Sequence, residues 1–156
     1  MDNTATIAQK PAAGFDLSNL DAVALGDEGA DCRIINPRDG SFTGIVIRIK
    51  GAFAPAFQER LARIRRREAI KQRNAVARAV ADEDDDETAK VLAEMTLGWW
   101  TVTKEGEEER KELYILDKGR QLSFDRATAA DVFTRYPVIR GQVFSFALDT
   151  ANFTKG

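Results

Sequence analysis

The side chains with the clearest capacity for chemistry are a run of cations in the middle of the chain. Residues 60–78 contain eight Lys or Arg and one acid, a net charge of +7, and no helix breaker interrupts them. If this segment is a helix, its cations could lie along the phosphates of a nucleic acid. The candidate phosphate contacts, which share one side of that helix, are Arg60, Arg63, Arg67, Lys71 and Arg78.

A block of acid directly follows these cations. Residues 82–87 are all Asp or Glu, and their charge of −6 nearly cancels that of the basic segment. Such carboxylates would compete with phosphate for the arginines and would repel an approaching nucleic-acid backbone. The same acids suit the positive end of a helix dipole if a second helix begins here. We therefore interpret the basic segment as a solvated helix balanced by acid, and nucleic-acid binding is the weaker alternative.

Residues suited to catalysis or metal binding are scarce. The chain has no histidine, which removes the commonest base at neutral pH and the commonest metal ligand. Its single cysteine, Cys32, cannot form an internal disulfide or a usual zinc site, and we expect it to be buried. The stretch "GDEGAD" at 26–31 lacks the spacing of a phosphate-binding loop. The sequence thus predicts a protein that is not an enzyme and that needs no cofactor or metal.

The elements expected to carry these residues give an α+β fold in four segments. Residues 1–29 mix glycine and proline with isolated apolar residues, which predicts a flexible N-terminal arm in which only the apolar positions of 15–23 suggest docking. Residues 30–54 hold two apolar runs around the turn "NPRDGS" and predict a β-hairpin whose isoleucine face needs a cover. Residues 55–87 predict the long basic helix, followed by an acidic linker.

In the fourth segment, residues 88–156, the sequence pattern predicts a mainly helical C-terminal domain: a small helical bundle with a short β ribbon. Its first helix, "DDETAKVLAEMTLGWW", is predicted to end at Gly98 and to place Trp99 on the same face as its aliphatic residues. The ribbon is expected between "WWTVT" and "QLSF". Two further helices are predicted in "RATAADVFTRY", capped by Ser123 or Asp125, and in "VIRGQVFSFALDTANF".

The last two predicted helices carry more apolar residues than an ordinary core stripe needs. Phe144 and Leu148 extend the apolar side of the final helix, and Trp99 and Trp100 at the base of the ribbon are interpreted as hydrophobic anchors. The surplus either forms a partner surface or packs on the hairpin and the first helix of the bundle, and the sequence favours neither. The candidate protein-binding residues are Trp99, Trp100, Val132, Phe133, Tyr136, Ile139, Val143, Phe144, Phe146 and Leu148.

The order of these segments resembles a known family. "INPRDGSFTGIVIRIKG", a basic helix, "MTLGWW" and "LSFDRATAADVFTRYPVIRGQVFSFALDTANF" together look like the tail assembly chaperones of long-tailed bacteriophages and related prophages, over about residues 31–153. The carboxy-terminal third carries the most specific part of the likeness. The chain departs from the family pattern at residues 101–121, which are longer and more charged than the short hairpin usual there.

The resemblance implies a non-enzymatic helper of tail morphogenesis. It implies that the chain binds the tape-measure protein, recruits tail-tube subunits, acts in the cytoplasm of the bacterial host and is absent from the mature virion, and it leaves self-association open. No stretch approaches the roughly 18 apolar residues of a membrane span, so no membrane partner is expected. Two alternatives remain: a structural tail or head-to-tail connector protein of the virion, and a nucleic-acid-binding protein that uses the basic helix.

Overall fold

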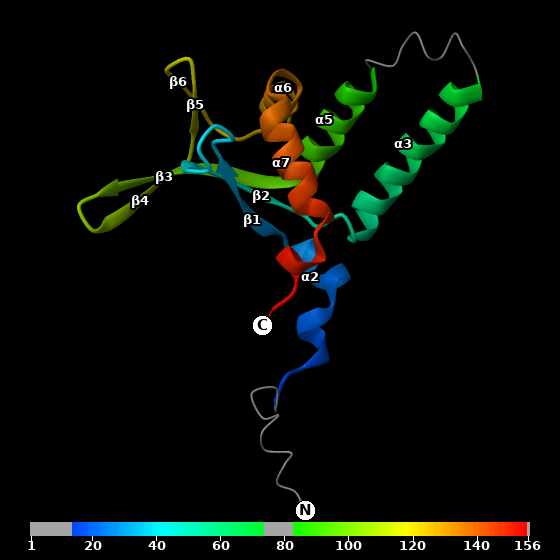
Figure 1. Ribbon diagram of the computed structural model, residues 1–156, viewed down its shortest axis with the longest axis horizontal. Coiled ribbons are helices and arrows are strands. Elements are labelled where there is room, and N and C mark those ends of the chain that lie inside the picture. Colours follow the sequence, from blue (N-terminus) through cyan, green and yellow to red (C-terminus); the bar gives the residue numbers. More distant parts are fainter. Residues whose placement is uncertain (1–13, 74–82, 156) are drawn as a thin grey trace, which may run out of the picture.

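The computed structural model describes residues 14–73 and 83–155, without the side chains of 67, 68, 70–73 and 83–86. Five α-helices and two antiparallel sheets occur in this part of the chain, which confirms the α+β class (Figure 1). The helices are α2 (Ala22–Glu28), α3 (Pro55–Arg73), α5 (Glu83–Met95), α6 (Arg126–Arg135) and α7 (Pro137–Leu148). The strands are β1 (Ala30–Ile35), β2 (Phe42–Ile49), β3 (Thr96–Glu105), β4 (Glu108–Glu112), β5 (Ile115–Asp117) and β6 (Arg120–Leu122).

A four-stranded antiparallel sheet in the order β1-β2-β3-β4 forms the centre of the molecule. β1 and β2 make the antiparallel pair that was expected as a hairpin. β3 joins the other side of β2, where Trp99 lies opposite Ile47 and Trp100 lies opposite Val46. The expected hairpin is therefore not a separate unit, because the strand that pairs with it comes from the segment predicted to be a mainly helical domain.

The boundary between α5 and β3 differs from the prediction. The helix ends at Met95 and the strand begins at Thr96, so the helix predicted to reach Gly98 is wrong in its last turn. Thr96 Oγ1 donates a hydrogen bond to Leu92 O at 2.6 Å, and Lys50 N donates one to Met95 O at 3.0 Å. The second bond occupies a carbonyl group that a continuing helix would use. The aromatic residues that follow consequently lie in a strand.

The charged middle of the chain agrees with the prediction in part. α3 provides the expected basic helix over Pro55–Arg73, while residues 74–82, where that helix was predicted to continue, lie outside the described residues. α5 begins at Glu83, so most of the acidic block forms the first turns of a helix, as the dipole argument predicted, and is not only a linker.

The charged stretch at 101–121 takes part in two hairpins. In the first, β3 pairs with β4 and thereby adds a fourth strand to the main sheet, although the sequence predicted only a short separate ribbon in this region. In the second, β5 pairs with β6 across a turn in which Lys118 and Gly119 both have positive φ, at 52° and 79°. The second hairpin confirms the short ribbon predicted before "QLSF".

The predicted flexible arm is wrong for residues 17–28. These residues form a 3-10 helix at Leu17–Leu20 and then α2. The side chains of Asp16 and Asp21 cap the two helices by accepting hydrogen bonds from the amides of Ser18 and Ala24. Residues 1–13 of the predicted arm lie outside the described residues.

α2 docks through a close approach of two backbones. Gly51 N donates a hydrogen bond to Gly26 O at 2.8 Å, and a Cβ on Gly51 would lie only 3.1 Å from Gly26 Cα and from the ring of Phe153. Lys155 N, near the other end of the chain, donates to Asn19 O at 2.8 Å. The apolar positions of 15–23 suggested docking, but Leu17, Leu20 and Val23 are at least half exposed, and the docking depends instead on glycines, whose missing side chains leave no apolar pattern.

One core lies between the main sheet and helices α5, α6 and α7, which gather on one side of that sheet (Figure 1). α7 contacts β1 and β2, and α5 contacts α6. The isoleucine face of β2 is therefore covered, as the sequence required. The largest fully buried side chains are Ile47, Ile49, Phe57, Leu92, Val132, Phe133 and Val143. Within the described ranges, no helix combines the length and the apolar composition that a membrane span needs.

Candidate protein-binding surface

The junction between α6 and α7 is the centre of the candidate surface. Asp125 caps α6 by accepting a hydrogen bond from Thr128 N at 2.7 Å, which confirms one of the two expected caps. Tyr136 follows the end of α6, and Pro137 begins α7, because proline lacks an amide hydrogen and fits the first turn of a helix. The two helices thus meet at one residue and hold the side chains on either side of it in fixed positions.

Four of the candidate residues lie in the core. Trp99, Val132, Phe133 and Val143 are at most 2% exposed, so a partner cannot contact these side chains while the chain is folded. For these positions the structure supports core packing, the alternative that the sequence left open.

The two adjacent tryptophans differ sharply in their surroundings. Trp99 Nε1 donates a hydrogen bond to Leu122 O at 2.9 Å, and its ring makes a T-shaped contact with Phe124 at a centroid distance of 5.3 Å. Trp100 is half-buried, and the ammonium group of Lys111 lies 3.8 Å from the centre of its ring. Trp99 therefore anchors the chain's own β5–β6 ribbon, and only Trp100 keeps an exposed surface.

The phenylalanines of α7 are also largely used within the chain. Phe144 and Phe146 are half-buried and pack against the core, and Phe146 makes a T-shaped contact with Phe153 at 5.6 Å. Leu148 is 45% exposed. Much of the apolar surplus predicted for this helix consequently has a place in the folded chain.

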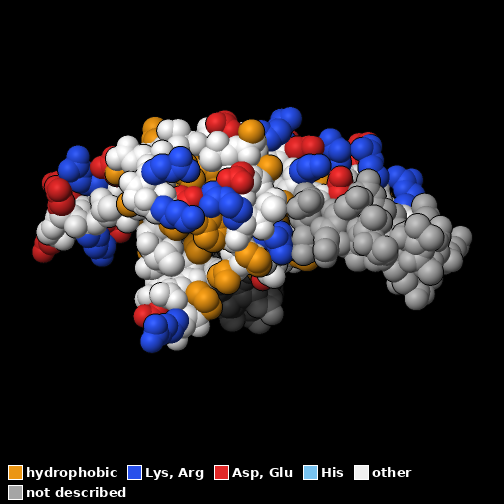
Figure 2. Space-filling model, turned by 90° about the horizontal axis from the view of Figure 1, so that it is seen from above, with side chains coloured by type: hydrophobic (Ala, Val, Ile, Leu, Met, Phe, Trp, Pro, Cys, Tyr) orange, Lys and Arg blue, Asp and Glu red, His pale blue; other side chains and the backbone are white. Residues whose placement is uncertain are grey.

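A depression that we call the α6–α7 hollow lies beside the helix junction. Its volume is about 280 Å³, and it is bounded by β2, by the β5–β6 ribbon and by the two helices. The candidate residues that a partner could contact there are the half-buried Tyr136 and Ile139, because Val132 also lines the hollow but is 1% exposed. Figure 2 shows hydrophobic side chains gathered beside cationic ones on the side of the molecule where the ribbon and α6 lie. The residues that line the hollow are Ile45, Ile115, Leu116, Asp117, Lys118, Val132, Tyr136 and Ile139.

A second and more open depression, which we call the β1–α7 groove, lies on the other side of the start of α7. It has a volume of about 660 Å³ and runs between β1 and α7. Phe146 is the candidate residue that reaches it. The residues that line the groove are Cys32, Arg33, Pro37, Pro137, Val138, Gly141, Gln142, Ser145, Phe146, Asp149 and Asn152.

An ion-pair cluster fixes one wall of the hollow. The Tyr136 hydroxyl donates a hydrogen bond to Asp117 Oδ1, and Arg135 Nη2 lies 2.8 Å from both Asp117 Oδ2 and Asp131 Oδ2. The Tyr136 hydrogen bond, and then the one from Arg135, lower the pKa of Asp117, and the same carboxylate raises the pKa of Tyr136. The cluster ties the β5–β6 ribbon to the end of α6.

Sequence reasoning missed two exposed apolar residues that line these depressions. Leu116 is 57% exposed at the hollow, and Val138 is 51% exposed at the groove. The alternation in "ILD", with Ile115 and Asp117 buried and Leu116 exposed, was the signal available for the first. Val138 had no such signal, because the helical pattern treats all apolar residues of α7 alike.

No family model, curated protein or solved structure matches this chain. The observations that bear on its function are the two apolar depressions and the resemblance carried by residues 31–153.

The basic helix is partly neutralised by acids other than the acidic block. Arg60 Nη2 lies 2.7 Å from Glu94 Oε2 on α5, and Arg63 Nη2 lies 3.5 Å from Glu59 Oε1 on the preceding turn. α3 also includes Arg67 and Lys71, but their side chains are not described, and Arg78 lies outside the described residues. Of these five candidates, the structure therefore describes only the side chains of Arg60 and Arg63, and each of the two is paired with a carboxylate.

Cys32 is buried, as predicted, and burial raises the pKa of its thiol to about 11. In residues 14–73 and 83–155, no group of three or more Cys, Asp or Glu side chains is placed to hold a metal ion. The candidate surface is therefore the exposed apolar area of the α6–α7 hollow and the β1–α7 groove, which are bounded by α6, α7, the β5–β6 ribbon, β1 and β2.

Proposed function

We propose that the chain is a non-enzymatic tail assembly chaperone of a long-tailed phage or prophage, which binds the tape-measure protein and recruits tail-tube subunits. The observation that carries this proposal is the pair of apolar depressions on either side of the start of α7, with Leu116 and Val138 more than half exposed at them. α6 and α7, which lie in the part of the chain that resembles the chaperone family most specifically, contribute to these depressions, whereas Leu116 lies in the 101–121 stretch that departs from the family pattern.

The physical basis of the proposed binding is apolar burial. A client helix that exposes an apolar stripe can place side chains at i, i+3, i+4 and i+7 into a concave apolar surface. Burial of one aliphatic side chain contributes about 1.5–3 kcal/mol, so a few such contacts are enough for a transient complex. No bond has to be made or broken for this activity.

The test is co-expression of the chain with the tape-measure and tail-tube proteins encoded beside it, followed by affinity capture. We expect capture of both by the wild-type chain and a loss of about ten-fold or more for Val138→Asp, since the carboxylate would be buried without a partner. The matched control is Val23→Asp. Val23 is 50% exposed, close to the 51% of Val138, and each valine is the second residue of its helix, so both variants place a new charge in the same local setting.

Equal loss of capture in the two valine variants would contradict the choice of surface. No capture by the wild-type chain would contradict the function itself. Mass spectrometry of purified particles is the complementary measurement, because a fixed ratio of this chain to the tube subunit in mature virions would mean a structural component in place of a chaperone.

A further inference from the structure

The first strand of the main sheet has an open edge. β1 is the outermost strand, and it pairs with β2 in one register from Ala30 to Arg33, with a register shift between Arg33 and Ile35. Ile34 O accepts a hydrogen bond from Thr43 Oγ1 at 2.8 Å, so the backbone groups of residue 34 face β2. Because successive residues of a strand direct these groups to opposite sides, those of Arg33 and Ile35 face away from the sheet.

A side chain from α7 occupies part of this edge in the manner of a strand. Ile35 N donates a hydrogen bond to Gln142 Oε1 at 2.8 Å, and Gln142 Nε2 donates one to Ile35 O at 2.7 Å. This pair of bonds is the exchange that a residue on a neighbouring antiparallel strand would make. The primary amide of Gln142 thus takes the place of a backbone amide at one rung of the ladder.

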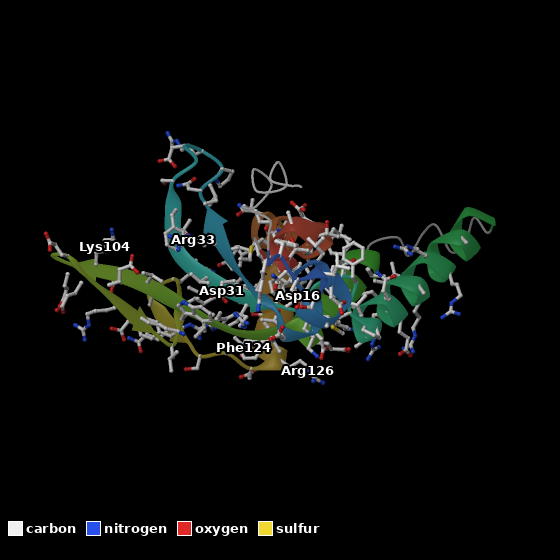
Figure 3. All side chains as sticks on the ribbon, turned by 90° about the horizontal axis from the view of Figure 1, so that it is seen from below. Asp16, Asp31, Arg33, Lys104, Phe124 and Arg126 are labelled. Carbon is white, nitrogen blue, oxygen red and sulfur yellow. The ribbon has the colours of Figure 1, made fainter. Side chains whose placement is uncertain are left out.

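The next rung is open. In the part of the chain that the structure describes, the outward N–H and C=O of Arg33 have no hydrogen-bond partner. Arg33 lines the β1–α7 groove, as do Gly141 and Ser145 of α7. A Cβ on Gly141 would meet no atom within 4 Å, so the α7 side of the groove is recessed here. Figure 3 shows Asp31 and Arg33 one after the other along β1.

We propose that the β1–α7 groove binds an extended segment of a client polypeptide, which adds to β1 as a fifth strand of the sheet. The segment pairs with the backbone of Arg33 and displaces the Gln142 amide from Ile35. Main-chain bonds supply affinity in this mode, while the apolar wall of the groove selects alternate side chains. This inference rests on the proposed function, because it takes the segment to belong to a client, and it specifies that this client contact is a strand.

A second copy of this chain fits the edge less well than a client segment. Since Gln142 reaches the outward groups of Ile35, α7 overhangs the open edge of β1. Antiparallel pairing of two β1 strands would place both overhanging α7 helices on the same face. The two strands would be about 4.8 Å apart, whereas packed helices need about 8–10 Å between their axes. A lone extended segment carries no such helix.

The edge can be tested by removing a single backbone donor. Arg33→Pro deletes the outward N–H of residue 33, and proline is tolerated on edge strands where that group does not bond to the sheet. Arg33→Ala is the matched control, because it keeps the N–H and removes the same side chain, including its contact with the ring of Phe42. The probes are short overlapping peptides that cover the tape-measure and tail-tube proteins, and binding is measured by fluorescence anisotropy.

We expect at least one peptide to bind, Arg33→Pro to weaken it by about ten-fold or more, and Arg33→Ala to weaken it by less than about three-fold. Gln142→Ala removes the competing amide and should tighten binding by several-fold. This variant keeps the test decisive even if Arg33→Pro fails to fold. Hydrogen exchange on the wild-type chain is an independent measurement, in which we expect the bound peptide to slow the exchange of the Arg33 and Ile35 amides.

Several outcomes would overturn the inference. Capture of the full-length clients without binding of any peptide would leave the proposed function standing and reject the added strand. The added strand would also be rejected if Arg33→Pro and Arg33→Ala weakened peptide binding equally, or if Gln142→Ala bound the peptide more weakly than the wild type. A dimer of this chain that is lost in Arg33→Pro but kept in Arg33→Ala would assign the edge to a second copy.

Discussion

Replacing Trp99 with phenylalanine separates the core role of this residue from the partner contact that its sequence context suggested. The indole is 2% exposed, donates to Leu122 O and packs edge-on against Phe124. Trp99→Phe keeps an aromatic ring in the site but removes the hydrogen-bond donor and part of the volume. We expect a large loss of stability and no direct effect on client capture.

The size of that loss follows from two contributions. A missing volume of roughly 40 Å³, at about 24 cal/mol per Å³ of residual cavity, costs about 1 kcal/mol. The Leu122 carbonyl loses its indole partner, and a buried acceptor left unsatisfied costs about 1–3 kcal/mol. Trp99→Phe should therefore lower the free energy of unfolding by about 2–4 kcal/mol, a large fraction of the stability of a small domain.

Trp100→Phe is the control, because it makes the same chemical change at the next position. Trp100 is half-buried and its ring lies under the Lys111 ammonium, a contact that phenylalanine retains in weaker form, so the expected loss is less than about 1 kcal/mol. Urea unfolding followed by circular dichroism measures both variants. The chain has only two tryptophans, so each variant also has a single emitter, and Trp99 in Trp100→Phe should emit at the shorter wavelength.

Equal destabilisation by the two substitutions would refute this account of the sheet, and so would an inverted order of emission wavelengths. Reduced client capture by Trp99→Phe, at a temperature where circular dichroism shows it folded, would restore Trp99 as a partner contact and place the binding surface nearer the β5–β6 ribbon.

Two further predictions concern stability. In Gly51→Ala the new Cβ would lie 3.1 Å from Gly26 Cα and from the Phe153 ring, so this variant should lower the free energy of unfolding, measured in urea, by about 1–3 kcal/mol. In Gly141→Ala the new Cβ meets open space in a helix, so this control should raise the free energy of unfolding by about 0.5–1 kcal/mol, and equal effects of the two variants would contradict the docking of α2. Because hydrogen bonds lower the pKa of Asp117, its carboxylate stabilises the fold above about pH 4, the unfolded value, and this stabilisation disappears as the pH falls through the folded value. Urea midpoints for Asp117→Asn should accordingly depend less on pH in the acid range, and curves parallel to those of the wild type would contradict the ion-pair cluster.

Local sequence signals predicted the elements whose ends depend on nearby residues. The Asp125 cap of α6 follows from the preference of aspartate for the position before a helix, and the chain divides into two helices between "RATAADVFTRY" and "VIRGQVFSFALDTANF" as predicted, although α7 already begins at Pro137. Where the outcome depended on residues far apart in sequence, the predictions failed. The apolar spacing of α5 continues in phase to Trp99, and only the pairing of that residue with Ile47 makes it part of a strand.

The binding surface was overestimated for a related reason. The sequence left open whether the apolar surplus of α6 and α7 forms a partner surface or packs on the hairpin and on the first helix of the bundle, and much of it packs on these elements. α6 packs on α5 and α7, and α7 packs on β1 and β2, so Val132, Phe133 and Val143 are buried. Of the exposed remainder, Leu116 had a signal in the alternation of "ILD", whereas Val138 could not be identified from the sequence, because a helical pattern gives only the face of an element and not the extent of its cover.

The position of α7 determines how the two proposed contacts can be separated. Val138, Gln142 and Ser145 follow one another at helical spacing along the groove, whereas Ile139 lies at the hollow. One rigid helix thus presents an apolar pocket on one side and a strand-like amide on the other. A client that presents only an apolar helix can use the hollow without the groove, and an extended client segment can use the groove without the hollow. Under the proposed function, this separation would allow a tape-measure helix in the hollow and an extended segment of a tube subunit in the groove to be bound at the same time.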